Sequence, residues 1–113
     1  MTLEEIIWTE ASVAAAKAAV EQNDKLPPEN ARGFDCGFAW IVIKPARGSF
    51  VKWAKEQKLG ETRDYGGGGF QIWYSKLSVV PTQSVSVHEA AVKAATEVFK
   101  KYGIPAEWSS RLD

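Results

Sequence analysis

Two cations and a hydroxyl group stand where an apolar run meets an amphipathic segment. Lys44, Arg47 and Ser49 follow directly on Gly37–Ile43, a run without a charged side chain. A buried strand that leads into a helix N-terminus places such side chains beside unpaired backbone N–H groups, which favour anions. The pattern predicts a phosphate- or carboxylate-binding site at the 44–49 junction. The alternative is that Ser49 only caps the helix, since the spacing of a P-loop is absent.

Four consecutive glycines, 66–69, follow Arg63, Asp64 and Tyr65. Glycine loses more backbone freedom on folding than any other residue, so such a run is costly to order. It indicates either a mobile hairpin tip or a loop whose bare N–H groups close over a ligand. On the second interpretation, the ligand-binding residues are Lys44, Arg47, Ser49, Arg63, Gly67, Gly68 and Arg111.

Five tryptophans are a surplus for a chain of this length. Trp40 and Trp53 fall on faces that are predicted to be buried. Trp73 falls on the less apolar side of its strand, so we predict that it anchors a partner together with Tyr65. The alternative is that the N-terminal helix covers the face on which Trp73 lies.

Catalytic chemistry is not predicted. His88 is the only histidine and is expected in a helix cap or at the surface, whereas Cys36, the only cysteine, is expected to be an inert core thiol. A dyad of these two residues has no positive support, and a zinc site needs about four ligands. We therefore expect that the chain is not an enzyme and holds no cofactor or metal.

Composition predicts an ordinary globular domain. The 113 residues are 45% apolar and 25% charged, and we expect a single domain, 1–113. Lys and Arg number 14, as do Asp and Glu, so no general attraction to nucleic acid or membranes is expected. No apolar run is long enough to span a bilayer, and Glu4, Glu5 and Glu10 stand where a signal peptide carries cations. The expected location is the cytoplasm.

The chain divides into an N-terminal helix (1–23), a loop (24–34) and a core (35–113). Thr2 and Glu5 form a capping box that opens the first helix. The predicted apolar stripe of this helix consists of Leu3, Ile6, Ile7, Ala11, Ala14 and Ala18.

The core is predicted to be α+β. Its expected elements are a central strand over 37–43, a helix over 49–59, strands over 61–65 and 70–74, a helix over 87–102 and an edge strand over 106–112. Ser49, and a capping box of Ser86 with Glu89, are expected to open the two helices, which Gly60 and Gly103 stop. The order β-α-β-β-α-β predicts a ferredoxin-like or related sheet with helices mainly on one face.

Several stretches of the core resemble those of known families. Cys36 to Trp40, Pro45 to Arg47, Phe50 to Lys52, the glycine run, Gly103-Ile104 and Ser110 to Asp113 occur in this order. In this they resemble a family of small proteins encoded by tailed bacteriophages. That family has no established activity, so the resemblance implies a setting, the infected bacterial cytoplasm, and an accessory binding role. Residues 69–74 also resemble the aromatic strand of RNA-recognition domains.

Three functional hypotheses follow. The first is a non-catalytic phage accessory protein that binds a host or phage macromolecule, most simply a protein, through Tyr65 and Trp73, with homodimerisation through the Trp73 face as one version. The second is a small anionic or nucleotide-like ligand held at the 44–49 junction. The third is binding of single-stranded nucleic acid, against which the zero net charge argues.

Overall fold

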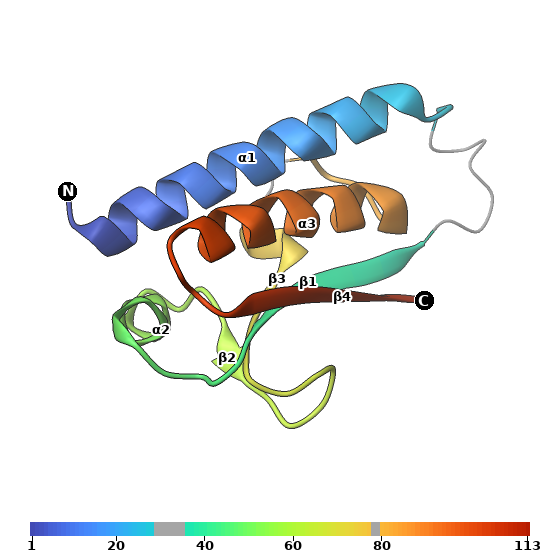
Figure 1. Ribbon diagram of the computed structural model, residues 1–113. Coiled ribbons are helices and arrows are strands. Elements are labelled where there is room, and N and C mark those ends of the chain that lie inside the picture. Colours follow the sequence, from blue (N-terminus) through green and yellow to red (C-terminus); the bar gives the residue numbers. More distant parts are fainter. Residues whose placement is uncertain (29–35, 78–79) are drawn as a thin grey trace.

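The computed structural model describes residues 1–28, 36–77 and 80–113 (Figure 1). In chain order its elements are α1 (Leu3–Lys25), β1 (Gly37–Ile43), α2 (Ser49–Glu56), β2 (Glu61–Thr62), β3 (Phe70–Trp73), the 3₁₀ turn η2 (Tyr74–Lys76), α3 (Val85–Lys101) and β4 (Ala106–Leu112). The protein is therefore α+β, with the predicted order of helices and strands. Of the predicted loop 24–34, residues 29–34 lie outside the described residues, as does residue 35 at the start of the predicted core.

The four strands form one antiparallel sheet in the order β2-β3-β1-β4. β1 pairs with β3 from Trp40↔Trp73 to Ile43↔Phe70, and with β4 along its whole length. The central position of β1 and the edge position of β4 are both confirmed. β1 can occupy the middle because its side chains are apolar on both faces of the sheet.

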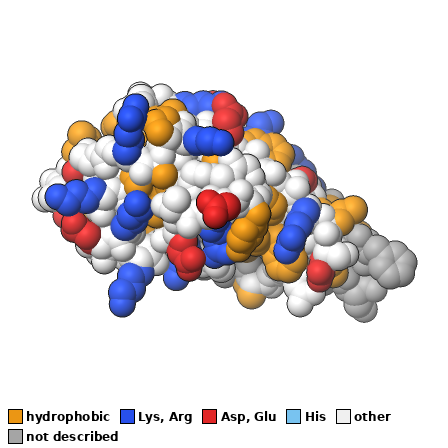
Figure 2. Space-filling view, turned by 90° about the horizontal axis from the view of Figure 1, so that it is seen from below, with side chains coloured by type: hydrophobic (Ala, Val, Ile, Leu, Met, Phe, Trp, Pro, Cys, Tyr) orange, Lys and Arg blue, Asp and Glu red, His pale blue; other side chains and the backbone are white. Residues whose placement is uncertain are grey.

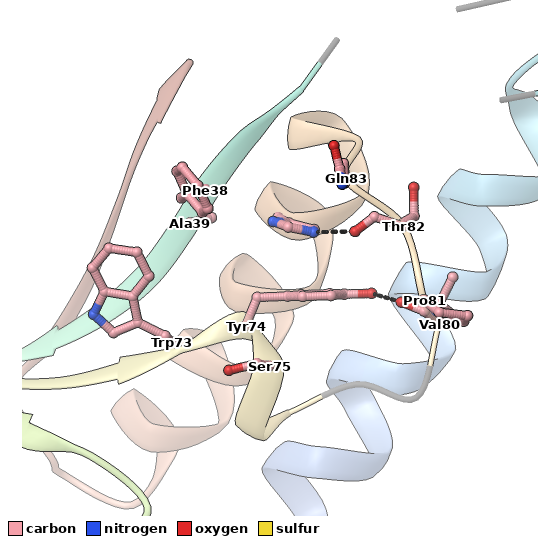
Figure 3. A pocket seen from close by; sticks show the side chains of 10 residues that line it. Phe38, Ala39, Trp73, Tyr74, Ser75, Val80, Pro81, Thr82 and Gln83 are labelled. Carbon is pink, nitrogen blue, oxygen red and sulfur yellow. Dashed lines mark hydrogen bonds between the residues drawn. The ribbon is translucent and has the colours of Figure 1, made fainter. Parts of the chain in front are cut away.

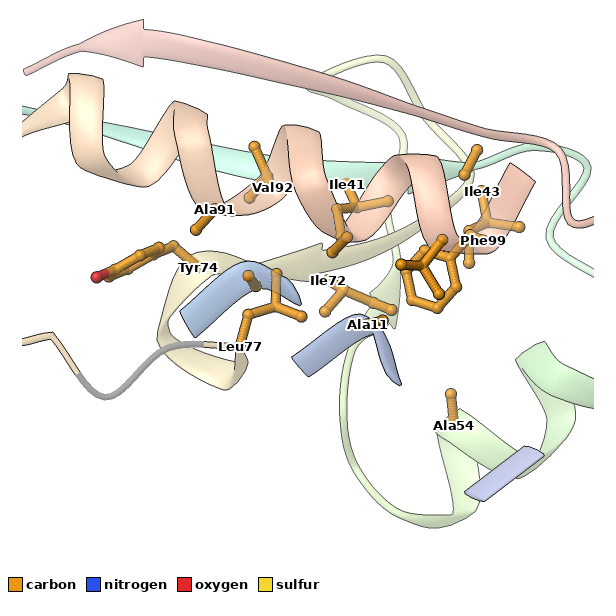
Figure 4. Close-up of a cluster of buried hydrophobic side chains, with 14 of the residues drawn as sticks. Ala11, Ile41, Ile43, Ala54, Ile72, Tyr74, Leu77, Ala91, Val92 and Phe99 are labelled. Carbon is orange, nitrogen blue, oxygen red and sulfur yellow. The ribbon is translucent and has the colours of Figure 1, made fainter. Parts of the chain in front are cut away.

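The helices cover one face of this sheet. α3 lies on the sheet and α1 lies on α3, so the layers follow one another in Figure 1. The core between these layers includes Ile41, Ile43 and Ile72 from the sheet, Ala91, Val92 and Phe99 from α3, and Ala11 from α1 (Figure 4). α2 closes one end of the core, where the Phe50 ring packs 5.1 Å from that of Phe99.

The apolar stripe of α1 differs from the predicted one. α1 buries Ile7, Ala11, Ala15 and Ala19. Leu3 and Ile6 are instead 59% and 42% exposed. The buried row has a strict four-residue spacing, and its small side chains let the backbones of α1 and α3 approach closely. The larger apolar residues of the first turn lie outside this narrow contact.

Two predicted helix caps and one predicted helix stop are wrong, although α2 begins at Ser49 as predicted. The capping box of Thr2 and Glu5 is confirmed, but α3 begins at Val85, before the predicted box of Ser86 and Glu89. The cause is that Gln83 already accepts a hydrogen bond from the Gly37 N–H, at 3.0 Å, which fixes the entry to α3. Gly48, not Ser49, precedes α2, and no side chain caps that helix.

Gly60 does not end α2 as predicted, because the helix already ends at Glu56. Lys58 takes the left-handed conformation, with φ of 59°, and the Leu59 N–H bonds to the Ala54 carbonyl at 3.0 Å. Gly60 is needed for another reason, because a Cβ there would lie 2.2 Å from the Gln71 carbonyl oxygen. Gly103 does end α3 as predicted, with φ of 78°. None of the helices in the described ranges is both long and apolar enough to cross a membrane.

Candidate functional site

The face of the sheet that the helices leave open carries an aromatic cluster. Phe38, Trp40 and Trp73 alternate with the core-facing residues of β1 and β3, so their rings project away from α3. The rings of Trp40 and Trp73 stack at 4.7 Å with an interplanar angle of 15°, and Phe38 lies 6.0 Å from Trp73. Trp73 is half-buried. α1 therefore does not cover the Trp73 face, and that alternative is wrong.

The glycine run folds back over one part of this open face. Trp40 Nε1 donates a hydrogen bond to the Gly66 carbonyl at 2.7 Å, and the Gln71 amide nitrogen donates to the carbonyls of Tyr65, Gly66 and Gly68. All four glycines have positive φ, between 65° and 99°. A Cβ on Gly69 would lie 2.6 Å from the Ile43 carbonyl oxygen. The run is thus held against the sheet and does not stand free as a hairpin tip.

An apolar hollow opens where β3 ends. Beyond Trp73 the chain turns away as η2, while β1 extends further, to Gly37. The resulting space has a volume of about 550 Å³, and its walls include Phe38, Trp73, Tyr74, Val80, Pro81 and His88. We call this space the apolar hollow. Figure 3 shows Phe38 and Trp73 on one side of it, facing residues 80–83 on the other.

His88 is buried in the wall of the apolar hollow. Its ring stacks on Tyr74, with centroids 3.9 Å apart, and its Nε2 lies 2.8 Å from the Thr82 carbonyl oxygen. A carbonyl can only accept, so Nε2 carries the proton. Nδ1 is buried and has no hydrogen-bond partner among the described residues. The prediction of a cap or surface histidine is wrong. The available signal was the helical spacing of His88 from Val85 and Ala91, which are both buried.

A second hollow lies on the other side of Trp73 and is lined by cations. Its volume is about 520 Å³, and its walls include Lys55, Lys58, Arg63, Lys76, Glu61 and Trp73. We call it the basic hollow. Arg63 lies 3.7 Å from Glu61 and 5.6 Å from the centroid of the Trp73 ring. The three lysines are exposed and form no ion pair within the described part of the chain.

Trp73 therefore lines both the apolar hollow and the basic hollow. Ser75 also lines both of them. The lysines come from the end of α2 and from η2, and the aromatic rings come from β1 and β3. Since Trp40 already stacks on one face of Trp73, the arrangement can take a planar ring against the indole surface left in the apolar hollow and an anion among the cations of the basic hollow.

The predicted ligand-binding residues are divided among separate places. Lys44, Arg63 and Gly68 line a hollow of about 560 Å³ between the 44–46 turn and the glycine loop. Arg47 and Ser49 line another hollow, of about 520 Å³, beside α2. Figure 2 shows Lys and Arg side chains spread over the open face and not gathered at one point.

The remaining predicted residues lie elsewhere on the open face. Gly67 faces Val42, and a Cβ there would be 3.3 Å away from its side chain. Tyr65 is 59% exposed and its hydroxyl accepts a hydrogen bond from Arg63. Arg111 lies over Phe38, at 5.5 Å. That position is roughly 20 Å from Lys44, at about 3.3 Å per strand residue.

Metal-ligating side chains do not gather in the described ranges. No three His, Cys, Asp or Glu side chains there could hold a metal ion. Cys36 is exposed, contrary to the prediction of a core thiol. The reason is that β1 begins only at Gly37, so that Cys36 stands at the end of the sheet.

No protein-family model, curated protein or solved structure matches the chain. The functional conclusion therefore rests on the geometry of the two hollows.

Proposed function

We propose that the protein is a non-catalytic binding protein that takes up a nucleotide unit, an aromatic base with its phosphate, across Trp73. The observation that carries this proposal is the position of Trp73 between the apolar hollow and the basic hollow. The base enters the apolar hollow and stacks on the exposed ring surfaces of Trp73 and Phe38. The phosphate lies among the lysines of the basic hollow.

The local distribution of charge supports an anionic ligand, although the net charge of the chain is zero. Lys55, Lys58, Arg63 and Lys76 line the basic hollow with one carboxylate, Glu61. Because Arg63 already pairs with Glu61, the three lysines remain available for a phosphate. An exposed ammonium acts as a point charge, so it suits the changing position of a phosphate in solution.

The strand order supports a ferredoxin-like arrangement, which we include in the proposal. A sheet in the order β2-β3-β1-β4, built from β-α-β-β-α-β, has the connections of the split βαβ pattern. RNA-recognition domains stack bases on aromatic side chains of a four-stranded sheet. Here the aromatic side chains of the two central strands share the open face. This likeness is an analogy of fold and adds to the geometry of Trp73.

The nucleotide unit can be free or part of a single strand, and both sources share the same chemistry. An accessory protein of a phage in the bacterial cytoplasm, as the resemblance implies, could use either. Binding of a protein partner through Tyr65 and Trp73 stays a prediction. The 44–49 junction is a weaker candidate, because its Arg47 and Ser49 line a different hollow from Lys44.

Equilibrium binding tests the proposal. Fluorescence anisotropy with labelled oligothymidine and oligoadenosine reports binding of a strand, and isothermal titration with mononucleotides reports binding of the free unit. We expect Trp73→Ala to weaken binding by ~1–3 kcal/mol, the usual worth of one stacked base. Trp8→Ala, in α1, which α3 separates from the sheet, is the control and should leave the affinity unchanged.

The charge of the basic hollow needs a separate variant. The triple variant Lys55→Ala, Lys58→Ala and Lys76→Ala should weaken binding and flatten its dependence on salt. Its matched control removes three exposed lysines from the helices, Lys17, Lys25 and Lys93, and leaves the net charge equal. Equal losses in both triple variants would indicate non-specific attraction. No binding by the wild-type protein in either assay would rule out the proposed function.

A further inference from the structure

Within residues 1–28, 36–77 and 80–113, the sheet edge formed by the seven residues of β4 carries no further strand. There β4 pairs with β1 alone, and Figure 1 shows it at the border of the sheet. The other edge strand, β2, has only two residues. An edge with unpaired N–H and C=O groups is a template for another strand. The side chains of β4 and the backbone groups that it directs outward decide which strand can pair with this edge.

The residues that present their backbone groups outward can be identified from the pairing with β1. The Asp113 N–H donates to the Cys36 carbonyl at 3.0 Å, and the Lys44 N–H donates to the Pro105 carbonyl at 3.2 Å. Hydrogen-bonded pairs alternate along an antiparallel ladder. Glu107, Ser109 and Arg111 therefore direct their backbone groups to β1. The outward groups belong to Ala106, Trp108, Ser110 and Leu112.

We propose that the β4 strands of two copies of this chain pair with each other, antiparallel and centred on Ser109. The charge pattern of β4 is self-complementary about this residue, since Glu107 stands two residues before it and Arg111 two residues after it. In the symmetric pairing, each Glu107 lies directly opposite Arg111 of the second copy. Opposite charges at directly opposed positions stabilise a sheet, and like charges destabilise it.

The same register also gives hydrogen-bond partners to the backbone N–H and C=O groups that point outward from β4. It sets Trp108 opposite Ser110 and Ala106 opposite Leu112, which are the residues whose N–H and C=O groups point outward. The whole strand Ala106–Leu112 is then paired through backbone hydrogen bonds with β4 of the second copy. A shift of the pairing by two residues in one direction puts Glu107 opposite Ser109, and in the other direction opposite Asp113. Either shift loses both ion pairs, and the second sets like charges against each other.

The pairing also covers exposed apolar side chains. Trp108 and Leu112 are 37% and 68% exposed, on the helix side of β4. In the proposed register, Trp108 lies diagonal to Leu112 of the second copy, within reach of an aromatic ring. Glu107 now lies 3.5 Å from Lys100, with 78% of its side chain exposed, and Arg111 is exposed over Phe38. Both charges are therefore accessible to a second copy.

Pairing of this kind joins the two sheets into one of eight strands around a two-fold axis perpendicular to the sheet. Both open faces then lie on the same side, so the two Trp73 rings face the same way. The inference does not depend on the proposed function, because it rests only on β4.

Light scattering and sedimentation measure the mass of the particle in solution. We expect twice the 12.4 kDa of one chain. Arg111→Glu and Glu107→Arg each set like charges opposite each other at two places, and should raise the Kd of the dimer about tenfold or more. The double variant with the charges exchanged should dimerise again. An equal mixture of the two single variants should form a heterodimer, since every pair is then opposite in charge.

A disulfide tests the register directly. Two Ser109 residues form a non-hydrogen-bonded pair with Cα atoms about 4.5 Å apart, within the range that a disulfide spans. Ser109→Cys in a Cys36→Ser background should therefore cross-link under mild oxidation. Glu107→Cys in the same background is the control, since residue 107 faces 111 and its own equivalent lies roughly 13 Å away. Circular dichroism confirms that each variant is folded.

A wild-type protein at the mass of one chain at all concentrations would overturn the inference. So would a dimer whose Kd is indifferent to both charge reversals, or one that cross-links through residue 107 and not through 109.

Discussion

The indole Nε1 of Trp73 donates a hydrogen bond to Oε1 of Gln71, at 3.2 Å. The amide nitrogen of the same Gln71, which is fully buried, donates to carbonyls of the glycine loop. An amide has one acceptor oxygen and one donor nitrogen, so these contacts fix its orientation. The orientation of the Trp73 ring is therefore coupled to the conformation of the glycine loop.

Gln71→Leu should break this coupling. The substitution removes the hydrogen bonds of the Gln71 side chain to the Gly68 carbonyl and to the Trp73 indole N–H, and we expect a loss of stability of ~1–3 kcal/mol. The Gly66 carbonyl still accepts from Trp40, and the Tyr65 carbonyl from the Gly68 N–H. Urea unfolding measures the loss, and near-ultraviolet circular dichroism reports the ordering of the tryptophans. Gln57→Leu, at an exposed position after α2, is the control. A Gln71→Leu spectrum identical to that of the wild type would show that the loop and the ring are independent.

Gly69→Ala should destabilise the protein more than Gly103→Ala. Both glycines have left-handed φ, 67° and 78°, so alanine costs about 1–2 kcal/mol of backbone strain at either site. A Cβ on Gly69 also meets the Ile43 carbonyl at 2.6 Å, whereas nothing lies within 4 Å of one on Gly103. The difference between the two unfolding free energies measures the close approach of the loop to β1. Equal losses would mean that the loop is not seated on the sheet.

Ala11→Leu should separate α1 from the core. Ala11 is fully buried on the side of α1 that packs on α3. Inserting a larger side chain at such a position typically costs ~1–3 kcal/mol. Val13→Leu adds a methylene at a position that is 63% exposed and should be nearly neutral. Chemical denaturation compares the two variants. A neutral Ala11→Leu would contradict the close contact of α1 with α3.

An ionic contact between α1 and α3 predicts a dependence of stability on pH. Hydrogen bonds from Lys101 and from Tyr102, the latter at 2.6 Å, lower the pKa of Glu10 below its ordinary value of 4.5. The carboxylate in turn raises the pKa values of Lys101 and Tyr102. The folded state binds the Glu10 proton less readily than the unfolded state. The contribution of the Glu10 carboxylate to the stability of the fold is therefore fully present above the ordinary pKa. It is lost as the pH falls through the lowered pKa.

Glu10→Gln should accordingly be less stable than the wild type at neutral pH, and the two should approach each other as the pH falls through the lowered pKa of Glu10 and its carboxylate becomes protonated. At the alkaline end, the contributions of Lys101 and Tyr102 are lost as the pH rises through their raised pKa values. Urea unfolding across this range gives the difference at each pH. If the difference in unfolding free energy between Glu10→Gln and the wild type were the same at every pH, the charge of Glu10 would not contribute to stability.

Local patterns were sufficient to predict the order of helices and strands, but the strand predicted over 61–65 is only Glu61–Thr62, the helix predicted over 49–59 ends at Glu56, and η2 was not predicted. The uninterrupted apolar run 37–43, apolar on both faces, identified a central strand, and the helical spacing around Ala91 identified α3. The start of α3, and the absence of a side-chain cap on α2, could not be predicted in this way. The position of Ser84 is set by the contacts of its neighbour Gln83 with β1, which come from residues distant in the sequence.

The candidate site was harder to predict for the same reason. The 44–49 junction looked complete because its residues are consecutive, but the structure distributes their side chains over different hollows. The basic hollow instead joins Lys55 and Lys58, at the end of α2, to Lys76 after β3. Only the strand order brings these residues to the side of Trp73. The glycine run could not be interpreted without Trp40 and Gln71, which bind its carbonyls.

The indole N–H signals in a heteronuclear NMR spectrum test the central claim most directly, because each of the five tryptophans gives one signal. During titration with oligothymidine or a mononucleotide, the account predicts that the Trp73 signal, assigned from Trp73→Phe, shifts with the bound fraction. The signals of Trp8 and Trp53, which belong to α1 and α2, should stay in place. Saturable binding that leaves the Trp73 signal unmoved would contradict the account, as would an absence of any shift at saturating ligand.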